Sequence, residues 1–125
     1  MIVLPSLRAL DRAQAARICL AAEATDVRCG FERLAERVRA VVRGDPLSGH
    51  LFVFRSRRSG RSKILAWDRD SFLLLYKRLE QGVFKLPRPK EGAHSLELRA
   101  SELAMILDGI DVSKLRRVAR YERVG

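Results

Sequence analysis

Hydrophobic and polar positions alternate in blocks along residues 51–78, and these blocks predict a three-stranded antiparallel meander. Apolar runs occupy 51–54, 64–67 and 72–75. The polar stretches 55–63 and 68–71 join them and contain Gly, Ser and Asp, which are residues that favour turns. We therefore expect strands at about 50–57, 63–68 and 72–78.

The residues between the runs predict how the strands pair. Ser59-Gly60 suits a two-residue hairpin connection in which Gly60 supplies a positive φ, and this turn places Phe54 opposite Leu65. Arg69-Asp70 as the second turn places Trp67 opposite Phe72. Because side chains alternate between the faces of a sheet, each face receives its own apolar set. One set is Phe52, Phe54, Leu65, Trp67, Phe72 and Leu74, and the other is Val53, Ile64, Ala66, Leu73 and Leu75.

Basic residues gather at one end of the predicted meander, close to its first turn. A cluster of exposed cations is the electrostatic signature of a protein that binds the phosphate backbone of nucleic acid. In this interpretation the cations contact phosphates and a tyrosine stacks on a splayed base. The candidate nucleic-acid-binding residues are Arg55, Arg57, Arg58, Arg61, Lys63, Tyr76, Lys77 and Arg78.

The remaining pattern predicts an α+β fold, with the meander packed against an amphipathic helix at about 26–43 and a second helix at about 101–108. Apolar residues recur at helical spacing in the first helix, which Thr25 or Asp26 would cap and Gly44 would end. Residues 16–21 could extend a helix that Ser6 caps or form a strand, and we favour the strand. Residues 83–87 and 95–98 are expected to add short edge strands. Residues 1–111 form one domain in this prediction, with 7–15 as an insertion. Residues 112–125 form a basic C-terminal tail or a short helix.

Composition supports a folded, basic protein. Of 125 residues 47% are apolar, and the 25 basic residues (five Lys and 20 Arg) against 15 acidic ones give a net charge of +10. Arginine suits phosphate recognition because its planar guanidinium donates two parallel hydrogen bonds. We find neither a membrane-spanning stretch nor a signal peptide, so we expect a cytoplasmic protein that can associate with the bacterial nucleoid.

Catalytic and metal-binding chemistry is not predicted. Cys19 and Cys29 lack the spacing of a zinc site and are read as buried thiols in a reducing compartment. Asp68 and Asp70 could hold Mg²⁺, but a turn between strands is where Asp occurs in any case, and Arg69 would compete for the carboxylates. His50 is read as a hydrogen-bonded structural residue. No catalytic residue, metal or cofactor is therefore expected.

Five stretches resemble a known family. They are TDVRCGFERLA (25–35), DPLSGHLFVFRSRR (45–58), KILAWD (63–68), LLYKRLEQGVFKLP (74–87) and LAMILDGID (103–111). In order and content they resemble the TnpB-type accessory proteins that the second reading frame of insertion-sequence-66 transposons encodes. The chain departs from that pattern at Val27 and Cys29, where the family usually has Met and Lys. It also departs at 68–71, where the family usually has a turn with Gly.

The resemblance implies an accessory role in DNA transposition beside a separate transposase, with no enzyme activity in this chain. The expected partners are transposon-end DNA and the transposase or other transposon-encoded proteins, with no membrane. The positions that match the family are Asp26, Arg28, Gly30, Arg55, Arg58, Lys63, Asp68, Lys77, Arg78 and Glu80.

Two other functions fit parts of the pattern. In the first, the cations bind an acidic surface of the transposase, and the protein is an adaptor that does not contact DNA. In the second, Asp68 and Asp70 hold a metal ion for a nuclease. A pull-down with the transposase alone, after nuclease treatment, separates the adaptor from the DNA-binding accessory protein. Mg²⁺-dependent cleavage that Asp68→Asn and Asp70→Asn abolish would identify the nuclease.

Overall fold

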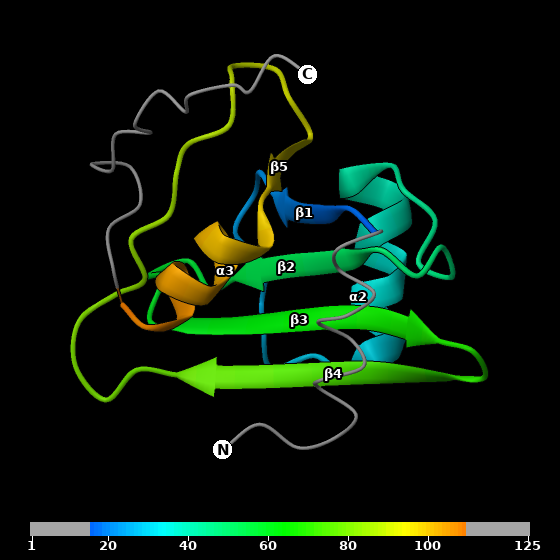
Figure 1. The fold of residues 1–125 in the computed structure, drawn as a ribbon, viewed down its shortest axis with the longest axis horizontal. Coiled ribbons are helices and arrows are strands. Elements are labelled where there is room, and N and C mark those ends of the chain that lie inside the picture. The colour runs from blue at the N-terminus through cyan, green and yellow to red at the C-terminus, as the bar shows by residue number, and fades with distance from the viewer. Residues whose placement is uncertain (1–15, 110–125) are drawn as a thin grey trace, which may run out of the picture.

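The computed structural model describes residues 16–109, which form a five-stranded sheet with one helical segment on each face (Figure 1). The strand order is β4-β3-β2-β1-β5. The strands are β1 (Ile18–Ala21), β2 (Leu51–Arg55), β3 (Arg61–Asp68), β4 (Ser71–Arg78) and β5 (Ser95–Leu98). The helical segments are α2 (Phe31–Arg37), which continues into the π-helix η1 (Val38–Val42), and α3 (Ala100–Leu107).

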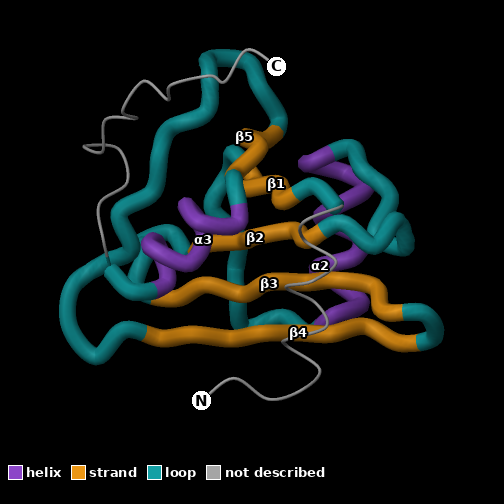
Figure 2. The backbone as a smooth tube through the Cα atoms, viewed as in Figure 1, coloured by secondary structure: helices purple, strands orange, loops and turns teal. Residues whose placement is uncertain are grey.

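The α+β class and the antiparallel meander β2-β3-β4 are confirmed, as is the strand at 16–21. The sheet is mixed because β1 pairs parallel with β2 and antiparallel with β5. After β4 a long connection, 79–94, passes around the sheet and returns the chain to β5 at the other edge (Figure 2). The sequence pattern does not predict this parallel pairing.

The predicted register is correct for one hairpin and wrong for the other. Between β3 and β4 the pairs Trp67–Phe72 and Leu65–Leu74 form as expected. Between β2 and β3, Phe54 lies opposite Lys63 and not Leu65, which is a shift of two residues. The first loop is longer than predicted, and the positive φ belongs to Ser59 (57°) and not to Gly60. A shift of two preserves the face of every side chain, so both predicted apolar sets remain on their faces.

Helix α2 begins at Phe31 with Gly30 as its N-cap residue, so the predicted cap at Thr25 or Asp26 is wrong. Asp26 instead accepts the backbone N–H of Arg28, which closes a local turn. The helix ends near the predicted Gly44, whose N–H donates to the carbonyl of Val38. A Cβ on Gly44 would lie 3.1 Å from the Phe52 ring, so only glycine fits this contact without displacement.

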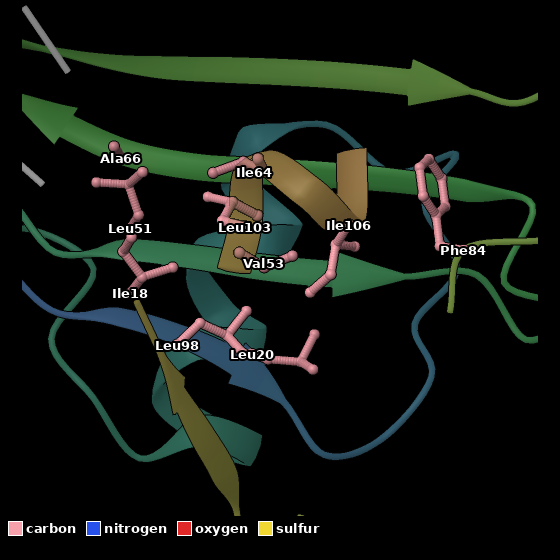
Figure 3. Packing of buried hydrophobic residues seen from close by; sticks show 10 residues of the cluster. All are labelled: Ile18, Leu20, Leu51, Val53, Ile64, Ala66, Phe84, Leu98, Leu103 and Ile106. Atoms are coloured by element: carbon pink, nitrogen blue, oxygen red, sulfur yellow. The ribbon is translucent and has the colours of Figure 1, made fainter. Parts of the chain in front are cut away.

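Both faces of the sheet are buried in separate hydrophobic clusters. Figure 3 shows the cluster between the sheet and α3, in which Val53 and Ile64 meet Leu103 and Ile106. On the opposite face Phe52, Phe54 and Leu65 pack against α2 and η1. Burial on both faces explains why β2 is a continuous apolar run.

Three predictions outside this core have different outcomes. The edge strand expected at 83–87 is wrong, because this segment has no strand pairing and Phe84 packs into the α3-side cluster instead. The predicted features at 1–15 and 112–125 lie outside the described residues. Within 16–109, no helix has the length and apolar character needed to cross a bilayer.

Candidate nucleic-acid interface

Residues 56–61, which are the loop between β2 and β3 together with the first residue of β3, form the arginine tip. Ser56 and Arg61 close it, since the Ser56 N–H donates to the Arg61 carbonyl (2.9 Å) and the Arg61 N–H donates to Ser56 Oγ (3.1 Å). Inside the loop, the Ser59 N–H donates to the Ser56 carbonyl. The Ser56 hydroxyl therefore stabilises a four-residue connection where the sequence predicted two residues.

Residues that follow β4 hold the arginine tip from outside. The Leu79 N–H donates to the Gly60 carbonyl (3.0 Å), and the Phe84 N–H donates to the Ser59 carbonyl (2.6 Å). The buried Phe84 ring connects this segment to the hydrophobic core. The backbone of the arginine tip is thus fixed at two points while the side chains of Arg57 and Arg58 remain exposed.

Five arginines line a depression of about 510 Å³ beside the tip, which we call the arginine pocket. Three segments far apart in sequence build it: the β1–α2 loop, the tip, and the end of β4. The residues that line it are Ala24, Thr25, Asp26, Val27, Arg28, Ser56, Arg57, Arg58, Gly60, Arg61, Arg78 and Leu79. Four of the eight candidate residues, Arg57, Arg58, Arg61 and Arg78, therefore lie together.

Asp26 is the acidic residue in the pocket lining, and Arg28 already neutralises it. Arg28 Nε lies 3.0 Å from Asp26 Oδ1 and Arg28 Nη2 lies 2.9 Å from Oδ2, which is a bidentate pair. These side-chain hydrogen bonds, with the bond from the Arg28 N–H, lower the pKa of Asp26 from 3.8 to about 2. The pair is ionised at neutral pH. No acidic residue within 16–109 forms a salt bridge with the other four arginines of the pocket.

Thr25 lines the pocket as a buried polar residue, with 6% of its surface exposed. Its N–H donates to the Arg55 carbonyl (2.9 Å), which attaches the β1–α2 loop to the end of β2. Its hydroxyl is buried without a hydrogen-bond partner among residues 16–109. A buried hydroxyl without a partner is energetically costly, so a ligand or water that satisfied it would stabilise this loop.

Lys63 and Tyr76 lie farther along the same sheet face and contact each other. Lys63 Nζ lies 5.3 Å from the centre of the Tyr76 ring, which is a cation–π geometry, and donates to the Cys29 carbonyl (2.8 Å). Lys63 thereby joins the β1–α2 loop to the sheet. Tyr76 remains half exposed, but Lys63 is committed to internal contacts.

Arg55 and Lys77 project to the opposite face of the sheet. Arg55 donates to the Ala22 carbonyl (3.5 Å) and lines a second depression of about 340 Å³. Lys77 donates to the carbonyl of Leu107, the last residue of α3. Neither cation belongs to the arginine pocket, so the eight candidates do not form one continuous surface.

The candidate list misses residues that come from other parts of the chain. Arg28 and Thr25 enter the arginine pocket through the β1–α2 loop. The sequence marked Arg28 only through the family resemblance, and it marked Thr25 through that resemblance and as a candidate helix cap. Lys85 and Arg88 line the second depression beside Arg55. No sequence pattern places these residues near the tip, because the approach depends on the parallel β1–β2 pairing and the long connection after β4.

The other chemical candidates have structural surroundings. His50 Nδ1 accepts the Arg17 N–H (2.9 Å), which links the start of β2 to β1, as the structural interpretation expects. The part of the chain between residues 16 and 109 contains no cluster of three or more His, Cys, Asp or Glu residues that could hold a metal ion.

The fold and pocket define a small basic α+β protein with an arginine-lined depression at one end of its sheet. The chain belongs to the family of IS66 Orf2-like proteins, whose model matches residues 16–117. This family places it among insertion-sequence proteins with an accessory role in transposition.

Two curated relatives come from Sinorhizobium fredii and are both described as uncharacterized. Protein y4hO is 37% identical over 116 residues, which is 93% of this chain and 99% of the relative. Protein y4jC is 34% identical over 101 residues, which is 81% of this chain and 85% of the relative. No solved structure matches the chain.

Proposed function

We propose that this protein is a non-catalytic accessory protein of DNA transposition, which binds the phosphate backbone through the arginine pocket and acts with a separate transposase. One observation carries the proposal: Arg57, Arg58, Arg61 and Arg78 line a single depression and form no salt bridge with an acidic residue of the described part of the chain. Family membership supports the transposition context. The backbone hydrogen bonds of the tip support it further, because a fixed loop loses less conformational entropy when it binds.

The proposal narrows the set of contact residues. Arg57, Arg58, Arg61 and Arg78 contact phosphates, and Tyr76 is placed to stack on a base of an opened strand, one pleat along β4 from Arg78. Lys63 and Lys77 are not among the proposed contacts, because each ammonium group already donates a hydrogen bond to a backbone carbonyl. Arg55 contributes at most through the second depression.

Salt dependence of DNA binding tests the proposal. Each phosphate contact on duplex DNA contributes about 0.9 to the slope of log affinity against log salt. The triple variant Arg57→Gln, Arg58→Gln, Arg61→Gln should therefore flatten the slope by about 2–3 units in fluorescence anisotropy titrations. Transposon-end duplex, a scrambled duplex and single strands of equal length serve as probes.

The matched control is Arg39→Gln, Arg43→Gln, Arg69→Gln, which removes the same charge from exposed positions in η1, just after it and in the β3–β4 turn. This variant should change the slope by less than about 1 unit, because it weakens only the long-range attraction between the protein and DNA and removes no proposed phosphate contact. Equal slopes for the two triple variants would remove the pocket from the interface. If the protein binds no nucleic acid but is retained by nuclease-treated transposase, the adaptor function replaces the one proposed.

A further inference from the structure

Strand β4 is a long and regular edge of the sheet that residues 16–109 form. It pairs with β3 at eight consecutive positions, Ser71 to Arg78, without a bulge, and no other strand within residues 16–109 pairs with its outer side. Exposed edges invite pairing with another chain, and most proteins protect them with Pro, bulges or charges near the middle. β4 has no Pro, and its two charges are both at its C-terminal end.

The middle of β4 exposes apolar side chains on both faces of the sheet. Leu74 (38% exposed) and Tyr76 (49%) point to the α2 side, whereas Leu75 (43%) points to the α3 side. Both helical segments leave this part of the edge uncovered, since the clusters beneath them contain none of these three residues. An edge that is apolar above and below suits a partner that continues the sheet.

A second copy of this chain fits this edge in one register. Opposed residues of an antiparallel pair lie on the same face of the sheet. A two-fold axis between two identical strands must therefore lie between the two copies of one residue, which then faces itself. With the axis at Leu74, Arg78 lies alongside Asp70 of the second copy, and this attraction occurs twice. The same register places Tyr76 opposite Phe72 and Leu75 opposite Leu73.

Neighbouring registers are less complementary. An axis at Leu75 places Arg78 opposite Phe72. An axis at Leu73 brings Arg78 to Asp68 but also Lys77 to Arg69, a like-charge pair, and it leaves only residues 71–75 of the two strands opposed. Charge pairs at an exposed rim select the register more than they add affinity. The apolar centre of the strand supplies the burial.

We propose that β4 is a dimer seam, in which two copies of this chain pair antiparallel about Leu74 and join their sheets into one. This inference goes beyond the proposed function: it concerns the edge strand, and Arg78 is the one residue of its argument that also lines the arginine pocket. A C2 interface of this kind is closed, so assembly stops at two copies.

Cross-linking tests the seam at the level of single residues. In a Cys19→Ser, Cys29→Ser background, Leu74→Cys should form an intermolecular disulfide on mild oxidation, because residue 74 faces itself across the axis at a Cβ distance near 4.5–5.5 Å. Leu73→Cys and Leu75→Cys serve as matched controls that face each other and not themselves, and each should cross-link at least about tenfold more slowly. Equal cross-linking at all three positions, or none at Leu74→Cys, contradicts the register.

Sedimentation equilibrium of the full chain, freed of nucleic acid, supplies the second measurement. The wild type should have twice the mass of one chain, and Asp70→Arg should raise the dimer dissociation constant about tenfold. The charge swap Asp70→Arg with Arg78→Asp should restore dimerisation. Circular dichroism confirms that each variant is folded. A wild type that stays monomeric at about 100 µM, or that grows beyond a dimer with concentration, overturns the proposal whatever the outcome of the DNA titrations.

Discussion

Asp26 and Arg28 show how two residues determine the charge of the arginine pocket. Arg28 is one of five arginines in the lining, yet its guanidinium is occupied by the Asp26 carboxylate through two side-chain hydrogen bonds. The pKa of Asp26 falls to about 2, chiefly because Arg28 donates to the charged carboxylate. Because the folded pKa is lowered, the pair stabilises the fold fully above about pH 4, and this contribution disappears as the pH falls through about 2.

Replacing Asp26 should therefore strengthen anion binding. Asp26→Asn removes a negative charge and releases Arg28 toward the pocket, so DNA affinity should rise and the salt slope should steepen by up to about 0.9. The gain in DNA affinity should be the same at every pH between 5 and 8, because Asp26 stays ionised over this range. Anisotropy titrations at three pH values measure this effect.

Glu36→Gln provides the control for net charge, since it removes the same charge from an exposed position of α2 outside the pocket. It should leave the slope nearly unchanged. A weaker affinity of Asp26→Asn for DNA would show that the Asp26–Arg28 pair holds the loop in a shape that favours binding. It would contradict the expectation that the pair only reduces the positive charge of the pocket.

At the level of elements, the two hairpins show which parts of the fold are readable from sequence. The β3–β4 turn formed in the expected register although neither Arg69 nor Asp70 is Gly, and Arg69 adopts a positive φ of 61°. The β2–β3 register was wrong because the Ser56 side chain caps a longer loop. Local apolar alternation predicts strands and faces well, whereas one side-chain hydrogen bond decides a loop length.

Lys77 connects β4 to the C-terminal end of α3, where carbonyl groups lack partners within the helix. Lys77→Met keeps the apolar stem and removes the ammonium group. We expect a loss of about 0.5–1.5 kcal/mol in the free energy of unfolding by urea, from the lost hydrogen bond and the lost cation at the helix C-terminus.

Arg78→Met is the matched control at the next residue, on the opposite face. Stability should change by less than about 0.5 kcal/mol there, while the DNA salt slope should fall by about 0.9. Lys77→Met should show the reverse, with lower stability and an unchanged slope. A slope that falls for Lys77→Met would return this residue to the nucleic-acid interface.

For the whole molecule, composition and pattern predicted one basic α+β domain with a cationic cluster, but not how the cluster is assembled. The arginine pocket needs the β1–α2 loop beside the tip, which follows from the parallel β1–β2 pairing. It also needs the connection after β4, which holds Gly60 and Ser59. Contacts between residues so far apart in the sequence depend on the packing of the entire sheet, and no short stretch of sequence predicts them.

The net charge of +10 predicts that salt stabilises the fold. Arginines that share a pocket repel one another, and ions screen this repulsion over about 10 Å at 0.1 M. The melting temperature should rise by roughly 2–6 °C between 20 and 300 mM NaCl, as measured by differential scanning calorimetry. The rise should be smaller in the Arg57, Arg58, Arg61 triple variant than in the Arg39, Arg43, Arg69 control. Identical rises in both would assign the repulsion to overall charge instead of the pocket.

The position of Arg78 at the far end of the edge strand has a consequence for the geometry of DNA binding. With a two-fold axis at Leu74, the two copies of Arg78 lie eight residues apart along the strand direction, about 27 Å, and the arginine tips extend beyond them. Because the axis is perpendicular to the sheet, both pockets open on the same side of the joined sheet. This spacing approaches the roughly 34–36 Å of one turn of B-form duplex, so a single dimer would straddle two phosphate clusters on one side of a duplex and favour inverted-repeat sequences.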